Sequence, residues 1–274
     1  MTTRTLVMRL AQVQASLLRQ QDANATAPKA DFDAVRDATW GLQRSAQRVL
    51  DADLRQSREA VAEIARQHPE MQTIIGYLVA DGERAARADL EEAVGELRSA
   101  VNSRLNPHSP VPTRLETQQG EVLAQADHLD GALRTARELQ DCGTWQGEAA
   151  QAYRTSADTQ TRALQEYAAV TRASAEYLGQ AALLHRATFF LCAESLKAAA
   201  AQIDVLVAGD AGHLFARTRR AIAQVNRATS QLGRDLDEAL QGTPALDLAR
   251  GLEDLVQGAE ILKGNWPQGG EPPK

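Results

Sequence analysis

The stretch Cys142-Gly143-Thr144-Trp145-Gln146-Gly147 interrupts two long helical patterns, and it decides how the chain folds. Gly143 and Gly147 allow the backbone to reverse, because glycine adopts positive φ without a steric cost. Thr144 is a typical N-cap for the helix that follows. Trp145 then stands at the joint, where an indole lying across both helices would bury about 150–250 Å² and fix their antiparallel pairing.

Apolar residues on both sides of this stretch recur at steps of three and four, as they do in amphipathic helices. No proline occurs from Arg114 to Thr243. The pattern predicts one helix over 113–141 and a second, about 90 Å long, over 147–208. The apolar stripe of the second helix includes Ala168, Ala175, His185, Phe189, Leu196 and Ile203.

Further helices are expected before and after these two. Helical spacing predicts them over 6–17, 31–67 and 69–105, from Leu214 to Leu240, and after Gly242. The stretch Asn106-Pro107-His108-Ser109-Pro110-Val111-Pro112 contains three prolines, which oppose a continuous helix. No segment alternates with period two over the length of a strand. The sequence therefore predicts an all-α protein, an elongated bundle of long antiparallel helices with a Trp-x-Gly hairpin.

These breaks also predict how the chain is divided. We expect an N-terminal three-helix module over 1–105, a proline-rich linker over 106–112, and a long helical hairpin with C-terminal helices over 113–263. The remaining residues, 264–274, are rich in glycine and proline and are expected to be disordered.

Charge and hydropathy exclude several classes of partner. The chain of 274 residues carries a net charge of −6, which argues against nucleic acid as a main partner. The basic run Arg217-Thr218-Arg219-Arg220 is interpreted as a solvated helix face. The most apolar stretch, Ala181 to Val207, contains five ionisable side chains, so no stable membrane span is expected. Because no cleaved signal peptide is recognised, we expect synthesis in the cytoplasm and, if the protein is exported, a non-classical route.

The sequence offers no arrangement of groups typical of catalysis. The five histidines are scattered and have no second ligand at metal spacing. His185 falls on the apolar stripe, where a hydrogen-bonded core histidine is the simplest interpretation. Cys142 and Cys192 are too few and too far apart for a disulfide framework. The sequence therefore predicts a protein that is not an enzyme, with no catalytic, cofactor or metal site.

The stretch Trp145-Gln146-Gly147-Glu148-Ala149-Ala150-Gln151-Ala152-Tyr153 resembles the WXG helical-hairpin family of type VII (ESX) secretion substrates. The matching positions are Trp145, Gly147, Ala149, Ala150 and Tyr153, and the resemblance covers about Thr113 to Ala187. It implies a Trp-x-Gly turn that joins two antiparallel helices, and hairpins that pair into four-helix bundles. The turn and recognition residues would be Gly143, Trp145, Gly147 and Tyr153.

The resemblance also implies a secretion signal of the form Tyr-x-x-x-Asp or Tyr-x-x-x-Glu, usually just after the second helix of a hairpin. The tyrosines at that expected position lack the acidic residue, so this part of the pattern fails there. Only Tyr77 and Asp81 fit it, and they lie in the N-terminal module. They are the candidate signal.

Three functions remain open at this point. The resemblance implies a non-enzymatic helical protein that an ESX export ATPase handles, or a secreted partner or scaffold that associates with another helical protein or with itself. The first alternative is an intracellular coiled-coil scaffold or assembly protein that is not exported. The second is a helical pore-forming protein, which is disfavoured because ionisable side chains would enter the hydrocarbon.

Overall fold

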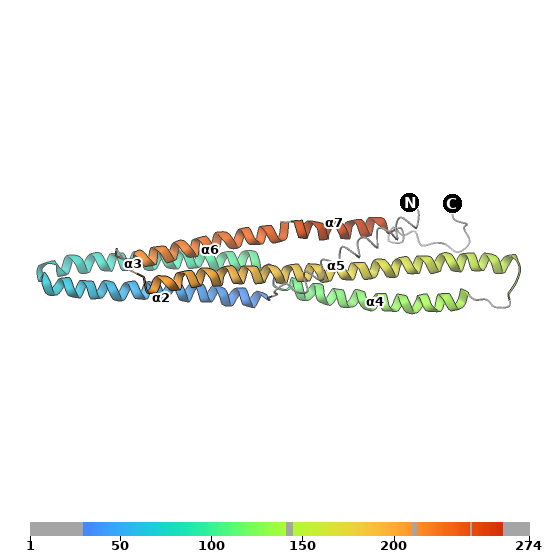
Figure 1. Cartoon of the computed structure of the whole chain (residues 1–274), viewed down its shortest axis with the longest axis horizontal. Helices are drawn as coiled ribbons and strands as arrows, with labels where there is room; N and C mark the ends of the chain where they lie inside the picture. Colours follow the sequence, from blue (N-terminus) through green and yellow to red (C-terminus); the bar gives the residue numbers. More distant parts are fainter. Residues whose placement is uncertain (1–29, 141–144, 210–212, 242, 260–274) are drawn as a thin grey trace. The chain divides into compact units, whose positions relative to one another are not determined.

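The computed structural model describes residues 30–140, 145–209, 213–241 and 243–259, and these ranges contain helices and no strand. The α-helices are α2 (Phe32–Gln67), α3 (Gln72–Ala100), α4 (Val111–Gln140), α5 (Glu148–Val207), α6 (Ala216–Gln241) and α7 (Thr243–Gly258) (Figure 1). The prediction of an all-α helical bundle is confirmed. The predicted helix over 6–17, the tail over 264–274 and the turn residue Gly143 lie outside the described residues.

The observed helices begin and end within a few residues of the predicted ones, except around the prolines. The predicted helix over 69–105 is divided into a 3₁₀ turn η1 (Pro69–Met71), α3, and a π-helical segment η2 (Val101–Leu105). A second 3₁₀ turn, η3 (Asn106–His108), follows. α4 then begins inside the expected linker, because Pro112 occupies its first turn, where no backbone N–H is needed for a helical hydrogen bond.

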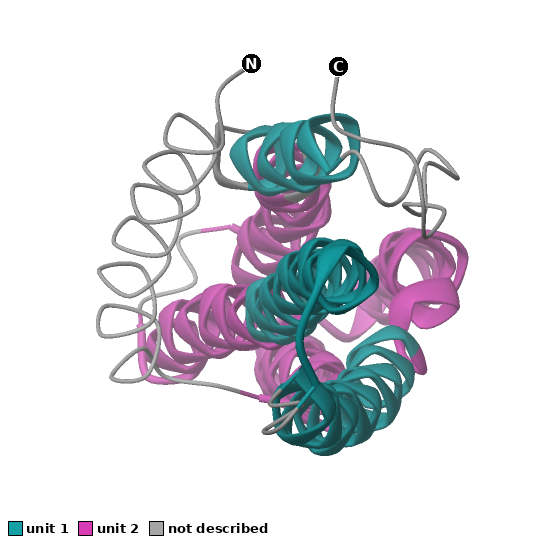
Figure 2. Cartoon of the chain, turned by 90° about the vertical axis from the view of Figure 1, so that its right-hand side faces the viewer, with its two compact units in different colours: residues 1–27, 111–184, 242–274 teal, residues 28–110, 185–241 magenta. Residues whose placement is uncertain are grey.

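The described chain forms two compact units that alternate along the sequence (Figure 2). Unit 1 takes 111–184 and the described residues after 242, and unit 2 takes 30–110 and 185–241. α5 therefore contributes its first part to unit 1 and its second part to unit 2. This division differs from the expected modules of 1–105 and 113–263, because the second part of α5 and all of α6 pack with α2 and α3.

Unit 2 is a four-helix bundle of α2, α3, the second part of α5, and α6. The N–H of Ala30 donates to the carbonyl of Arg186 at 3.2 Å, and Arg48 pairs with Asp204 at 2.6 Å, so α2 runs parallel to α5. The connection from α3 to α5 passes through unit 1, and such long crossovers are known in helical bundles. The core includes Val35, Leu42, Val49, Leu97, Leu105, Phe189, Leu196, Ile203, Val225 and Leu232.

The start of α6 is fixed by a strained phenylalanine. Phe215 has a φ of 56°, a left-handed conformation that costs a non-glycine residue about 1–2 kcal/mol. Its side chain is 4% exposed, and a Cβ added to Gly82 on α3 would lie 3.0 Å from the Cε2 atom of the ring. The glycine therefore makes room for an aromatic ring, whose burial offsets the backbone strain.

Unit 1 contains α4, the first part of α5, and α7. Arg172 pairs with Asp130, and Gln140 donates to Asp158 at 3.3 Å, so α4 and α5 are antiparallel. Gly179 lies inside the continuous helix α5, and a Cβ there would lie 2.5 Å from Nε2 of Gln119 on α4. A small cluster joins α5 to α7; its buried members are Val170, Ala173, Tyr177, Leu255 and Ala259.

Candidate functional site

The turn between α4 and α5 places Trp145 and Gly147 outside the helices. Gly147 has a φ of +99°, which an L side chain rarely adopts, and its carbonyl accepts the first helical hydrogen bond from Gln151 at 3.1 Å. Trp145 is 47% exposed, and its ring centroid lies 5.6 Å from that of Tyr153 with 51° between the planes. The aromatic ring of Tyr153 on α5 therefore covers part of the indole, which is less buried than expected.

Tyr153 ties this turn to α4. Its hydroxyl donates to the backbone carbonyl of Leu139 at 3.2 Å, while Arg154 donates to the carbonyl of Trp145 at 3.0 Å. The last carbonyls of a helix lack helical partners, so Tyr153 satisfies one at the end of α4. Of the four predicted turn residues, the structure brings together Trp145, Gly147 and Tyr153.

The hairpin of α4 and α5 has a thin hydrophobic face. The only buried residues of α4 are Pro112 and Ala126, and its leucines lie at the surface or half-buried. Leu123 is 43% exposed and Leu139 is 62% exposed. In the first part of α5 most of the buried apolar residues are alanines, such as Ala168 and Ala175. The exposed apolar side chains of this pair therefore include Leu123 and Leu139 of α4.

Tyr77 and Asp81, the candidate secretion signal, lie one turn apart on α3 in unit 2. The Tyr77 side chain is 71% exposed. Asp81 pairs with Arg84 at 3.3 Å, and both of these side chains are mostly exposed. The two signal residues are thus accessible within unit 2, whereas Trp145 belongs to unit 1.

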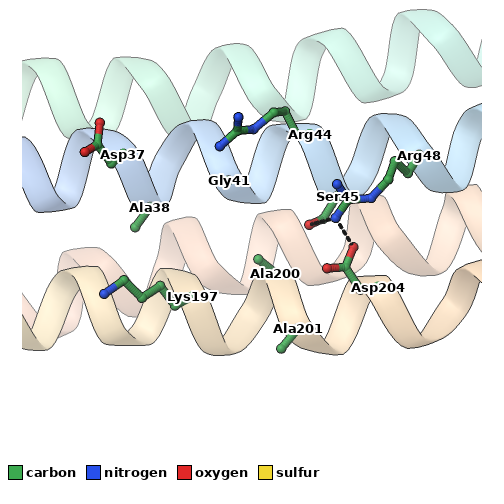
Figure 3. Close-up of a pocket in the computed structure, with 10 residues that line it drawn as sticks. All are labelled: Asp37, Ala38, Gly41, Arg44, Ser45, Arg48, Lys197, Ala200, Ala201 and Asp204. Atoms are coloured by element: carbon green, nitrogen blue, oxygen red, sulfur yellow. Dashed lines mark hydrogen bonds and ion pairs between the residues drawn. The ribbon is translucent and has the colours of Figure 1, made fainter.

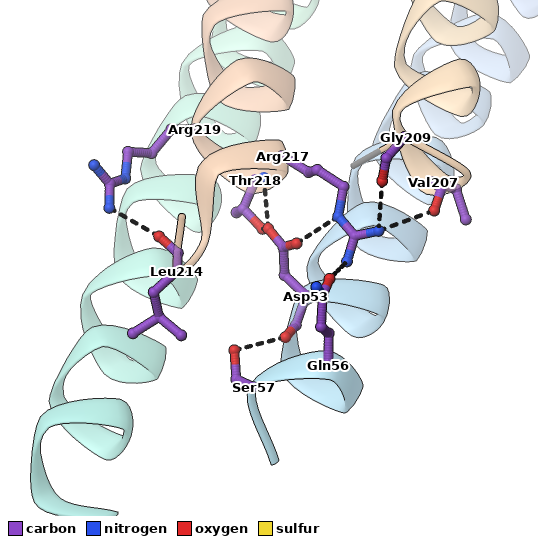
Figure 4. Close-up of polar contacts among 9 residues, drawn as sticks. All are labelled: Asp53, Gln56, Ser57, Val207, Gly209, Leu214, Arg217, Thr218 and Arg219. Atoms are coloured by element: carbon purple, nitrogen blue, oxygen red, sulfur yellow. Dashed lines mark hydrogen bonds and ion pairs between the residues drawn. The ribbon is translucent and has the colours of Figure 1, made fainter. Parts of the chain in front are cut away.

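The basic run at the start of α6 contains a buried polar network that its charge pattern did not predict (Figure 4). Arg217 is 7% exposed and its Nε donates to Asp53 of α2 at 2.6 Å, while the Asp53 side chain is 1% exposed. The same guanidinium donates to the carbonyls of Val207 and Gly209 at 3.2 and 3.1 Å. The prediction of a solvated face is wrong for Arg217, because its hydrogen bonds close the turn from α5 to α6.

Asp53 also caps α6. Its Oδ2 accepts hydrogen bonds from the backbone N–H and the hydroxyl of Thr218, each at 2.8 Å. Thr218 itself is fully buried. A carboxylate at a helix N-terminus satisfies an N–H that has no helical partner and is favoured by the helix dipole. The network therefore has a structural role. It fixes the position along α2 at which α6 begins.

A groove of about 460 Å³ runs between α2 and the second part of α5 (Figure 3). Its floor is formed by small residues, which let the two helices approach each other. Arg48 on its rim donates to Asp204 at 2.6 Å, so this carboxylate is already paired. The groove is lined by Asp37, Ala38, Gly41, Arg44, Ser45, Arg48, Lys197, Ala200, Ala201 and Asp204. This lining contains no histidine or cysteine.

His185 stacks on His108 in unit 2, with ring centroids 5.6 Å apart and 27° between the planes. The expected core histidine is therefore half-buried and lies against a second imidazole. Burial lowers the pKa of His185, and the neighbouring His108 lowers it further. Both effects favour the neutral ring in the folded chain.

We expect acid to destabilise unit 2 through His185. Its pKa is lower in the folded chain than its usual 6.5, so the unfolded chain binds the proton more tightly and stability falls as the pH drops below that value. His185→Phe should therefore lose less unfolding free energy than the parent chain between about pH 7.5 and pH 5.5. Urea denaturation at both pH values measures the difference. Equal losses in the two proteins would contradict this assignment.

Cys192 is the one cysteine among the residues that the structure describes. Cys192 is buried, and this burial together with Asp235 raises the pKa of its thiol to about 12, so the thiolate is disfavoured. Cys142 lies outside the described residues. No group of three or more His, Cys, Asp or Glu side chains within the described ranges is arranged to hold a metal ion.

No protein-family model, curated protein or solved structure matches the chain. No helix in the described part of the chain combines the length and apolar character needed to cross a membrane.

Proposed function

We propose that this chain is a non-enzymatic helical protein exported by a type VII (ESX) machine, where it serves as a substrate or as a secreted helical partner. The observation that carries the proposal is the Trp145 turn. A half-exposed indole lies beside Gly147 at positive φ and against Tyr153, between two antiparallel helices. These are the residues on which the resemblance to the WXG hairpin family rests.

The surface of α4 and α5 supports association with another helix pair. α4 buries few residues and leaves Leu123 and Leu139 exposed. Packing such a surface against a second pair of helices lowers its free energy relative to exposure to water, because burial of apolar area is favourable. Trp145 at the end of the pair has the size and half-exposed position of an interface anchor.

The accessible pair Tyr77 and Asp81 supports recognition by the export apparatus. Tyr77 is 71% exposed, and Asp81 follows it by one turn on the same side of α3. An export ATPase that reads a tyrosine and a carboxylate on a helix would find both without local unfolding. The tyrosine would supply apolar area and a hydroxyl, and the carboxylate a charge.

Export of the full chain from a bacterium that has an ESX system tests this function. Trp145→Ala and Tyr77→Ala are each expected to reduce the secreted fraction by about tenfold or more, since about 1.4 kcal/mol of lost recognition energy changes an affinity by that factor. Immunoblots of culture filtrate and cell pellet measure the fraction.

Two matched variants serve as controls. Trp40→Ala removes another tryptophan that is half exposed, at 50%, and Tyr167→Ala removes a tyrosine that lacks the acidic residue four positions later. Neither should change export. Undiminished secretion of both the Trp145 and the Tyr77 variants would refute the proposed function.

A further inference from the structure

A small pocket lies between the first part of α2 and the junction of α3 with η2, inside unit 2. Its volume is about 150 Å³, which is the size of a cavity that holds one benzene molecule. Pockets for drug-sized ligands are larger, about 300–1,000 Å³. We call it the Trp40 pocket, after the tryptophan that lines it. Its volume limits an occupant to a small molecule with a single ring.

The side chains that line the Trp40 pocket come from one face of α2 and from the helix opposite. Arg36, Trp40 and Gln43 follow one another by four and three residues, so they share a face of α2. Arg98 comes from the last turn of α3, and Val101 is the first residue of the π-helical segment η2. Segments of π-helix are rare and are frequently found at functional sites.

The inner part of the pocket contains a polar atom that lacks a partner. Thr39 and Val101 are 6% and 4% exposed, and Gln43 is half-buried. The Oε1 atom of Gln43 is shielded from solvent and accepts no hydrogen bond within the described part of the chain. The hydroxyl of Thr39 is not the missing donor, because it donates to the carbonyl of Val35 at 2.8 Å. A buried acceptor without a donor is unfavourable, so an occupant with a hydroxyl group would stabilise this atom.

The rim of the pocket is cationic. Its lining contains two arginines and no carboxylate. The guanidinium carbon of Arg98 lies over the Trp40 ring, 5.6 Å from the centroid, and no carboxylate of the described residues pairs with it. A guanidinium held over a ring keeps the N–H groups at its edge available, and these match a carboxylate in a bidentate arrangement. Arg36 pairs with Asp33 at 3.1 Å, but both side chains are mostly exposed, so this pair is weak.

We propose that the Trp40 pocket binds a small aromatic carboxylate that carries a hydroxyl group, such as 4-hydroxybenzoate. The carboxylate pairs with Arg98 at the rim, and the ring lies beside Trp40 and Phe32. The hydroxyl donates to Oε1 of Gln43. Each part of this ligand thus meets one feature of the pocket, namely the unpaired cation, the aromatic side chains and the unpartnered acceptor. The site goes beyond the proposed function and does not depend on export.

Titration of the full ¹⁵N-labelled chain with 4-hydroxybenzoate, followed by NMR of the indole N–H signals, tests this site. We expect the signal of Trp40 to shift with a dissociation constant of about 0.1–1 mM, which is typical for a ligand of this size. The signal of Trp145, which belongs to unit 1, should not move. A spectrum of Trp40→Phe identifies the Trp40 signal by its loss.

The charge of the ligand and the guanidinium of Arg98 are tested together. 4-Hydroxybenzamide has the same ring and hydroxyl but no negative charge, so it should bind about tenfold more weakly or worse. Arg98→Ala should weaken binding of the acid by a similar factor and leave binding of the amide nearly unchanged. Arg98 is exposed, so the variant should fold, which far-UV circular dichroism checks. Arg55→Ala removes an exposed arginine of α2 outside the pocket and is the matched control.

Gln43→Leu tests the contact with the hydroxyl. The parent chain should bind 4-hydroxybenzoate about fivefold more tightly than benzoate, because one hydrogen bond is gained. In the variant, which lacks the acceptor, the two acids should bind equally.

An unmoved Trp40 signal at about 10 mM ligand would overturn the proposal. Equal binding of the acid and the amide would also overturn it, as would an Arg98→Ala variant that binds the acid as well as the parent chain does. Equal shifts of Trp40 and Trp145 would show binding without a site and have the same consequence. A chain that binds the acid at Trp40 but is not exported would support this site and refute only the proposed function.

Discussion

Replacing Asp53 with alanine is expected to lower the free energy of unfolding by about 3–5 kcal/mol, because it leaves the buried guanidinium of Arg217 without its counter-charge. The same change removes both hydrogen bonds to Thr218, so the first turn of α6 loses its cap. Asp53→Asn keeps one acceptor oxygen and should cost less, about 1–3 kcal/mol. Urea denaturation followed by far-UV circular dichroism measures both variants.

The ion pair of Arg48 and Asp204 provides a matched control in the same unit. It also joins two helices at 2.6 Å, but its side chains are 56% and 44% exposed, so solvent screens the attraction. Asp204→Ala should therefore cost less than about 1 kcal/mol. Equal effects of Asp53→Ala and Asp204→Ala would contradict the structural role assigned to the buried network.

The second large effect is expected from Phe189→Ala. Phe189 is 1% exposed in the core of unit 2, and its ring forms a T-shaped pair with that of Phe32, with centroids 6.0 Å apart. Removal of a buried ring costs its transfer free energy and leaves a cavity, about 3–5 kcal/mol in total. Urea denaturation measures this loss. A lower midpoint with an unchanged m-value would show that the folded core has lost stability.

The adjacent residue offers a control of the same type. Phe190 also lies on α5, but it is half-buried and belongs to another face of the helix. Phe190→Ala should destabilise by clearly less than Phe189→Ala, because its ring is already partly in water. A larger effect at Phe190 would mean that α5 is turned about its axis relative to the described packing.

The helices were predictable because each has a strong periodic pattern of apolar residues and is ended by residues close to it in the sequence. The spacing of apolar residues predicted the bounds of α5 closely, and it placed Phe189 on the stripe that is buried in the structure. Gly147 was predicted at the reversal before α5 and has positive φ there. These features depend on residues close in sequence, for which periodicity and backbone conformation are sufficient.

The division into units could not be predicted from the same pattern. The apolar stripe of α5 continues from Ala182 to His185, across the point where one unit ends and the other begins, so nothing in its periodicity marks the boundary. Which helices cover each part depends on pairing between segments far apart in the chain. The proline-rich stretch before α4 marked a boundary, but it did not reveal that unit 2 resumes at residue 185.

The sequence of α2 contains an indication of the buried network. Asp53 follows Val49 by one turn and Ala46 by two, so a carboxylate stands in the apolar register of α2. A charge in such a position needs a buried partner of opposite sign. The basic run at Arg217 supplied that partner, although the sequence alone could not single it out from the other arginines.

Export of the unmodified chain tests the central claim most directly. The full protein would be expressed in paired bacterial strains, one with a functional ESX export ATPase and one in which that ATPase is inactivated, and its amount in culture filtrate and in cells would be compared. We predict that it reaches the filtrate only in the strain with the functional ATPase. Retention inside both strains, with the protein intact and folded, would contradict the claim that the Trp145 hairpin belongs to an exported helical protein.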